Sequence, residues 1–121
     1  MQKIAMLGSG FIGRFYADSL QGYRNRDKIV SIYSRRKESA QKFAKDYDVA
    51  FWTTQMEDAI ARPEVDIVCI SLPNHLHEEA VMLCCKHKKA VITTKPLGRN
   101  ATEAKRMLEA VEKAGIFNGY L

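Results

Sequence analysis

Short apolar runs alternate with helix-like stripes along this 121-residue chain, and that alternation constrains the fold most strongly. The runs that predict strands are residues 3–8, 28–34, 49–52, 66–72 and 89–94, with a sixth beginning within 115–121. Between them, apolar residues recur at the three- and four-residue spacing of amphipathic helices. We therefore expect a three-layer α/β domain with a doubly wound parallel sheet, strand order 3-2-1-4-5 and the start of strand 6.

Two of the expected helices carry recognisable end signals. Thr54 and Glu57 have the spacing of a capping box, which predicts a short helix over residues 56–61. Gly115 follows the last helical stripe, where a helix C-terminus favours glycine.

The composition fits one globular domain and excludes several other classes. Hydrophobic residues make up 46% and charged residues 27%, which argues against a disordered or collagen-like chain. No apolar run approaches the roughly 18 residues of a membrane span. The three cysteines are odd in number and lie in apolar segments, which favours reduced thiols. We therefore expect a cytoplasmic protein.

The net charge of +5 leaves two interpretations open. A basic chain can bind nucleic acid. Here, however, the lysines and arginines are spread along the sequence, with small clusters at residues 35–37 and 86–89. We therefore favour a solvated surface without nucleic-acid binding, and a net positive field also suits an anionic cofactor.

The glycine sequence Gly8-Ser-Gly10-Phe-Ile-Gly13 follows the first predicted strand and opens the first helix. In that context GxGxxG is a dinucleotide-binding pattern. Gly8 permits the tight turn, Gly10 lets a pyrophosphate approach the backbone, and Gly13 allows close packing of helix on strand. Phe11 and Ile12, at the helix start, belong to the same expected cofactor site. The alternative is a turn that is glycine-rich by coincidence.

The end of the second strand indicates which dinucleotide is preferred. An NAD site places an acid there for the ribose hydroxyls, but this chain has Ser34, Arg35 and Arg36. A hydroxyl and two guanidinium groups suit a 2′-phosphate, so we expect NADP to be preferred over NAD. The alternative is a pair of solvated arginines at a helix start, where the dipole mildly disfavours cations.

Polar residues also follow the fourth strand. Leu72, Pro73, Asn74 and His77 stand where ligands bind in doubly wound sheets, beyond the carboxyl ends of the strands. Asn74 could bond a ribose or an amide, whereas His77 could equally be a capping or packing histidine. His75 and His77 are two positions apart and do not share a helix face, so we expect no metal site.

The fifth strand ends in Thr94, Lys95 and Pro96. Lys95 could be structural, with its stem packed and its ammonium in solvent. At the expected cofactor crevice it could instead orient a substrate hydroxyl, lower the pKa of a neighbouring base or stabilise a developing alkoxide. We therefore treat Lys95 and Pro96 as candidate site residues, with Lys95 as the catalytic candidate.

These motifs together resemble one family. The segments IAMLGSGFIGRFYADSL, VDIVCISLPNHLHEEAV, KAVITTKPL and EAKRMLEAVEKAG are similar to the N-terminal Rossmann domain of the glucose–fructose oxidoreductase/inositol dehydrogenase/MocA family. The spacing of PNHLH and KPL, about 20 residues apart, is the most specific part. The resemblance implies an NAD(P)-dependent oxidoreductase that transfers hydride between nicotinamide and a sugar, cyclitol or related alcohol or aldehyde.

The resemblance also assigns roles to particular residues. Lys95 falls on the lysine of a Glu-Lys-Pro motif that supplies a catalytic or orienting group, although Thr94 replaces the glutamate. Pro73, Asn74 and His77 fall on the cofactor-facing strand-end motif, and Ser34 and Arg35 match NADP-using members. A cis bond before Pro96 is a further expectation.

The resemblance further bears on the rest of the protein. Residues 1–121 correspond to the cofactor-binding domain, and the family's C-terminal substrate domain, with its acid/base histidine, is expected to be absent from this chain. We expect cofactor binding with little or no turnover, and a homo-oligomer for the full-length enzyme. The alternatives are a non-catalytic dinucleotide sensor or partner subunit, and a nucleic-acid-binding module.

Overall fold

Six parallel strands form the centre of the computed structural model, which describes residues 2–24, 27–93 and 98–120. Their order is β3-β2-β1-β4-β5-β6, which confirms the expected topology. The strands are β1 (Lys3–Leu7), β2 (Lys28–Tyr33), β3 (Phe51–Thr53), β4 (Ile67–Ile70), β5 (Ala90–Thr93) and β6 (Asn118–Tyr120). The order reverses between β1 and β4, so a switch point lies at their carboxyl ends.

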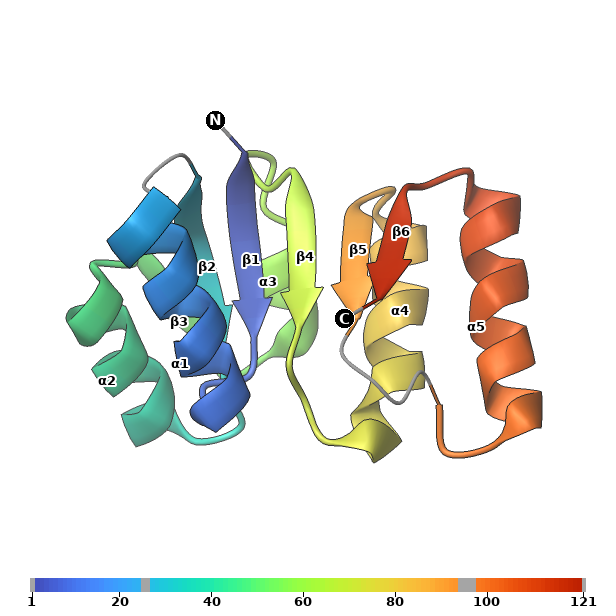
Figure 1. Ribbon diagram of the computed structural model, residues 1–121, viewed down its shortest axis with the longest axis horizontal. Coiled ribbons are helices and arrows are strands. Elements are labelled where there is room, and N and C mark those ends of the chain that lie inside the picture. Colours follow the sequence, from blue (N-terminus) through green and yellow to red (C-terminus); the bar gives the residue numbers. More distant parts are fainter. Residues whose placement is uncertain (1, 25–26, 94–97, 121) are drawn as a thin grey trace.

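The helices lie on both sides of this sheet (Figure 1). They are α1 (Phe11–Asp18), α2 (Lys37–Tyr47), α3 (Met56–Ile60), α4 (His77–Lys86) and α5 (Ala101–Ala114), with a π-helical turn at Ser19–Arg24 and a 3-10 turn at Asn74–Leu76. Helices α1 and α2 cover one face, and α3 and α4 the other. This arrangement is the expected three-layer α/β fold.

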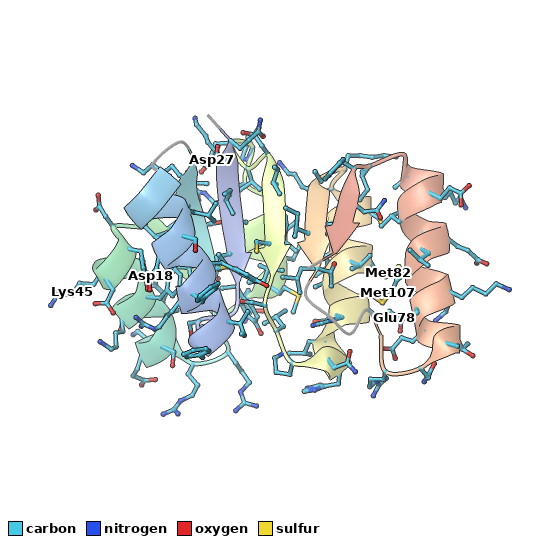
Figure 2. The ribbon with its side chains drawn as sticks, in the orientation of Figure 1. Asp18, Asp27, Lys45, Glu78, Met82 and Met107 are labelled. Carbon is cyan, nitrogen blue, oxygen red and sulfur yellow. The ribbon has the colours of Figure 1, made fainter. Side chains whose placement is uncertain are left out.

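Alternate residues of β1 supply the two cores. Ile4 and Met6 pack with α1 and α2, whereas Ala5 and Leu7 pack with α3 and α4. Both pairs are buried because β1 is a central strand covered on both faces. Met107 of α5 is buried in the second core beside α4 (Figure 2). The central strand is thereby fixed from both sides, and its carboxyl end has a defined position.

The third strand begins later than the sequence indicates. Residues 49–52 were expected, but β3 spans Phe51–Thr53. Asp48 adopts a left-handed conformation with φ of 55°, and the Val49 N–H donates to the Ala44 carbonyl at 2.8 Å. Val49 therefore closes the C-terminus of α2 and buries its side chain there.

The capping box predicted at Thr54 and Glu57 is wrong. Gln55 is the N-cap of α3, and its N–H donates to Thr53 Oγ1 at 2.9 Å. Glu57 instead accepts hydrogen bonds from Lys86 Nζ at 2.8 Å and pairs with His87 Nε2 at 2.7 Å. Lys86 and His87, at the end of α4, hold this carboxylate, so it does not return to the helix start.

An apolar hollow of about 460 Å³ lies between α1 and strands β4 and β5. Its lining includes Phe15, Tyr16 and Ile92, and it reaches Asp27 near the amino end of β2 (Figure 2). This hollow is distinct from the carboxyl edge, where the sequence places the polar motifs. None of the helices in the described part of the chain is long and apolar enough to cross a membrane.

Candidate functional site

The glycine turn joins β1 to α1 through backbone contacts that require glycine at two positions. Gly8 has φ of +106°, and a Cβ there would lie 2.6 Å from the Ser71 carbonyl oxygen. The Gly8 N–H donates to the Tyr33 carbonyl at 2.8 Å, which ties the turn to the end of β2. A Cβ on Gly13 would lie 2.5 Å from the Gly8 carbonyl oxygen. The turn is therefore a tight backbone junction.

Gly10 lies at the opposite, open side of the same turn. It is the N-cap of α1, with φ of −76°, and a Cβ added there would meet no atom within 4 Å. Neither the backbone conformation nor contacts with the described residues therefore require a glycine at position 10. Free space beside a helix N-terminus is what close approach of a phosphate to the backbone needs.

A pocket of about 590 Å³ opens at the carboxyl ends of β1, β2 and β4. It lies at the switch point, where doubly wound sheets bind ligands. Its lining residues are Gly8, Ser9, Gly10, Phe11, Ile12, Tyr33, Ser34, Arg35, Ser71, Leu72, Pro73, His75 and Leu76. The set contains backbone from the glycine turn, four hydroxyl groups and one guanidinium group. No carboxylate occurs among these described lining residues.

The end of β2 forms the polar side of this pocket. The Ser34 side chain is largely buried, and its hydroxyl lies 2.9 Å from the Ser9 hydroxyl. The exposed Arg35 follows directly. Burial raises the pKa of Tyr33, the negative charge of Glu79 raises it further, and Arg35 opposes the shift. The neutral phenol and the Arg35 cation leave this side of the pocket suited to an anion.

The structure brings eight of the predicted site residues into the pocket lining and separates the others. Those in the lining are Gly8, Gly10, Phe11, Ile12, Ser34, Arg35, Leu72 and Pro73. Gly13 lies directly behind the turn, and Arg36 is the exposed N-cap of α2, outside the lining. Lys95 and Pro96, the cis bond expected between them, and Thr94 all lie outside the described residues.

His77 and Asn74 are not among the residues that line the pocket. The His77 side chain is almost fully buried, and Nε2 lies 2.8 Å from the Leu72 carbonyl. Since a carbonyl oxygen only accepts, Nε2 carries the hydrogen in this contact. His77 therefore supports the β4–α4 connection from inside, as a packing histidine does. Asn74 Oδ1 is buried and has no hydrogen-bond partner among the described residues. It is an acceptor available to a donor group.

Five lining residues were missed from the sequence: Ser9, Tyr33, Ser71, His75 and Leu76. Ser9 lies within the glycine motif, and Tyr33 directly precedes Ser34, so position was an available signal for both. Ser71 directly precedes the predicted Leu72, but nothing in the sequence indicated its packing. Its hydroxyl donates to the Leu7 carbonyl at 3.0 Å and would lie 2.9 Å from a Cβ on Gly13. Only the folded turn shows that Ser71 packs against both glycines.

Side-chain hydrogen bonds around the buried Glu103 cap the start of α5. The Glu103 N–H donates to Asn100 Oδ1 at 2.9 Å, and the Arg99 N–H donates to Glu103 Oε1 at 3.1 Å. Arg99 also pairs through its guanidinium with Glu103 Oε2, at 3.0 Å from Nε. The hydrogen bond from the Arg99 side chain holds the pKa of Glu103 below its usual range. Asn100 is thus the N-cap of α5, and the Glu103 side chain reaches back past it to the Arg99 N–H, a variant of the capping box.

Metal ligands do not gather in the described residues, which contain no group of three or more His, Cys, Asp or Glu able to hold a metal ion. The polar groups that line the pocket are backbone N–H groups, hydroxyls, the His75 imidazole and the Arg35 guanidinium. These groups suit a phosphorylated ligand.

The sequence model of an oxidoreductase family with an NAD-binding Rossmann fold, Gfo/Idh/MocA, matches residues 2–119. The chain belongs to this family. The match covers the glycine turn, the end of β2 and both later strand ends, so the resemblance seen in the motifs is confirmed.

Two relatives in the Gfo/Idh/MocA family are named for different compounds. A Sphingobium 4-carboxy-2-hydroxymuconate-6-semialdehyde dehydrogenase is 31% identical over 94% of this chain and 36% of its own length. The scyllo-inositol 2-dehydrogenase (NADP(+)) IolU of Bacillus subtilis is 28% identical over 96% of this chain and 35% of its own length. The chain thus spans about a third of the length of the curated relatives it matches.

A solved structure shows the same fold. The NAD binding oxidoreductase from Klebsiella pneumoniae superposes with a TM-score of 0.92 at 27% identity, covering 99% of this chain and 34% of the other. The Rossmann architecture predicted from the alternation of strands and helices is therefore confirmed. This chain is an NAD-binding Rossmann domain of an oxidoreductase family.

Proposed function

We propose that this chain binds NADP(H) in preference to NAD(H) at the carboxyl edge of its sheet. The observation that carries the proposal is the end of β2, where Ser34 and Arg35 line the pocket and the described lining holds no carboxylate. A 2′-phosphate is a dianion that accepts hydrogen bonds, whereas ribose hydroxyls favour an acid. The Bacillus subtilis relative is named for NADP(+), which agrees with this preference.

The residues present fit a dinucleotide in several ways. Gly10 leaves open space at the N-terminus of α1, where free N–H groups and the helix dipole favour a pyrophosphate. Phe11 and Ile12 continue the lining along α1 and supply an apolar wall. On the opposite side, Leu72 and Pro73 line the pocket beyond β4. Asn74 directly follows Pro73, and its buried Oδ1, which has no hydrogen-bond partner among the described residues, would accept from a ribose hydroxyl or an amide N–H once the side chain turns toward the pocket.

For the whole protein we propose an NAD(P)-dependent oxidoreductase acting on a CH–OH group of a sugar, a cyclitol or a related alcohol or aldehyde. A bound nicotinamide would supply the hydride donor or acceptor. Lys95 would orient the reacting oxygen or stabilise its charge as the carbonyl and alkoxide interconvert. This role for Lys95 comes from its place in the Lys95-Pro96 motif and from the family resemblance.

We also propose that residues 1–121 act as the cofactor-binding part of a larger enzyme, with little turnover by themselves. The relatives are about three times as long, which supports this division. The free cysteines among the described residues are consistent with a cytoplasmic location, which we retain as part of the proposal.

A non-catalytic dinucleotide sensor or partner subunit is the second candidate. Thr94 favours it, because a hydroxyl replaces the carboxylate that precedes the lysine in the family motif. A hydroxyl would anchor an ammonium less strongly than a carboxylate. Hydride transfer by a longer form of this protein that depends on Lys95 would exclude the sensor.

Equilibrium titration of the chain with NADPH and NADH, followed by nucleotide fluorescence, tests the cofactor proposal. The wild type should bind NADPH at least about tenfold more tightly than NADH. Arg35→Ala should remove most of that difference, because a charge-assisted pair with phosphate is lost. Lys45→Ala is the matched control: it removes one positive charge on α2, directed away from the molecule (Figure 2). Equal affinities for both nucleotides in all three proteins would contradict the preference.

A further inference from the structure

Two serine hydroxyls from separate segments meet inside the pocket. Ser9 lies between the first two glycines of the turn, and Ser34 follows β2, 25 positions later. Their Oγ atoms lie 2.9 Å apart, which is a hydrogen bond in which either atom can donate. Both residues line the pocket, and Arg35 lies next to them. The pair therefore bridges the glycine turn and the residue expected to contact a 2′-phosphate.

The hydrogen count of this pair determines what it can offer a ligand. Each hydroxyl has one hydrogen and accepts through two lone pairs. One hydrogen is used between the two oxygens. The hydroxyl that accepts this bond still has its own hydrogen, and no other hydrogen bond from either side chain is found in the described chain. The pair therefore retains one donor for the pocket, whichever serine donates internally.

The surrounding backbone holds both hydroxyls in place. The Gly8 N–H donates to the Tyr33 carbonyl at 2.8 Å, and the Ser34 N–H donates to the Thr53 carbonyl at 3.2 Å. These bonds already join the turn to β2 and β2 to β3. The hydroxyl pair is thus not needed to hold the turn, and its donor is preorganised at a fixed position.

We infer that Ser9 is a specificity-determining residue, and that its hydroxyl acts with Ser34 as one unit to bind the 2′-phosphate of NADP(H). The inference rests on the proposed function. A dianion gains a charge-assisted hydrogen bond from the free donor of the pair, beside the Arg35 cation. A ribose hydroxyl gains only a neutral bond from the same donor, so the pair favours the phosphorylated ribose.

Binding of 2′,5′-ADP and 5′-AMP, measured by calorimetry, isolates this contact because the two probes differ by the 2′-phosphate alone. Ser9→Ala should weaken 2′,5′-ADP binding about tenfold and change 5′-AMP binding less than about twofold. Ser34→Ala should do the same. If the pair acts as a unit, Ser9→Ala/Ser34→Ala should lose little more than either single variant.

Ser39→Ala is the matched control, since Ser39 lies on α2 outside the pocket lining. Thermal melts of all variants show whether the turn is intact. Equal weakening of both probes by Ser9→Ala, or no weakening of either, would overturn the inference and leave NADP(H) binding standing. Wild-type protein that binds neither probe nor NADPH would overturn the proposed function itself.

Discussion

The Gly13 Cα faces the carbonyl oxygen of Gly8 so closely that a Cβ on Gly13 would lie 2.5 Å from it. The same Cβ would lie 2.9 Å from the Ser71 hydroxyl. The Gly8 carbonyl cannot retreat easily, because the Gly8 N–H is bonded to β2 and Gly8 itself has φ of +106°. The first turn of α1 is therefore in backbone contact with the end of β1.

Gly13→Ala should destabilise the domain. The added methyl forces backbone to move in a packed junction, which costs about 2 kcal/mol, or about 5–10 °C in Tm for a domain of this size. Thermal unfolding followed by circular dichroism measures the effect. A Tm within about 2 °C of wild type would show that α1 shifts away from β1 freely.

Gly10→Ala separates binding from stability. Its Cβ meets no atom within 4 Å, and its φ of −76° suits alanine, so the Tm should stay within about 2 °C of wild type. NADPH binding should nevertheless weaken by tenfold or more, because the methyl occupies the space where a pyrophosphate approaches. Fluorescence titration checks the affinity, and unchanged binding would argue against a pyrophosphate at this turn.

Ser34→Asp should reverse the cofactor preference. A carboxylate at the end of β2 accepts hydrogen bonds from ribose hydroxyls and repels a 2′-phosphate. We expect NADPH affinity to fall by about a hundredfold and NADH affinity to rise. Competition of the two nucleotides for the same sample measures the ratio directly. Ser34→Asn, which has a similar shape without the charge, is the control and should lose less NADPH affinity.

The sequence predicted the sheet order and the carboxyl-edge position of the pocket because both follow from periodicity and chain order. Gly8, Gly10 and Gly13 were identified by their spacing between a predicted strand and a predicted helix, and the packing of Gly8 and Gly13 agrees with the expected strand–turn–helix junction. The pairing of Ser9 with Ser34 could not be predicted in this way. It depends on the angle at which the turn meets β2, which no local pattern specifies.

Helix starts were predicted least well, because capping depends on which competing partners the fold supplies. Glu57 fits a capping box in sequence, yet Lys86 and His87 approach it from α4 and hold it there. Asn100 does cap α5 by accepting from the Glu103 N–H, and Glu103 accepts from the Arg99 N–H, which the hydrophobic stripe of α5 did not indicate. A polar residue followed three positions later by glutamate thus caps one helix and not the other, and tertiary contacts decide between them.

Acid should weaken the domain partly through Glu103. The Arg99 side chain lowers the pKa of this carboxyl in the folded state, so below the ordinary value of 4.5 the unfolded chain binds more protons. The stabilisation is present above that value and is lost as the pH falls through the lowered folded-state pKa. Glu103→Gln should therefore have a lower Tm than wild type at pH 7, with the gap narrowing below about pH 4.

Thermal melts of wild type and Glu103→Gln across pH 3 to pH 7, the range set by acid titration of carboxyl groups, measure this dependence. Glu109→Gln is the control, since Glu109 is an exposed residue of the same helix, 4.0 Å from Lys105. A gap in Tm that stays constant across this pH range would show that the stabilisation does not depend on ionisation of Glu103.

Alkylation should distinguish the three cysteines by burial. Burial raises the pKa of the Cys69 and Cys84 thiols to about 12, so at pH 8 roughly one in ten thousand of each is the reactive thiolate. Burial also raises the pKa of the Cys85 thiol, but this side chain is partly exposed. Iodoacetamide labelling of the native chain, followed by mass spectrometry, measures this difference. Cys85 should react before the other two cysteines, but more slowly than an ordinary exposed cysteine. Cys69 and Cys84 should react only as the chain unfolds, and all three should react promptly in denaturant. Labelling of Cys84 as fast as Cys85 in the native chain would contradict the close packing of α4 against the sheet.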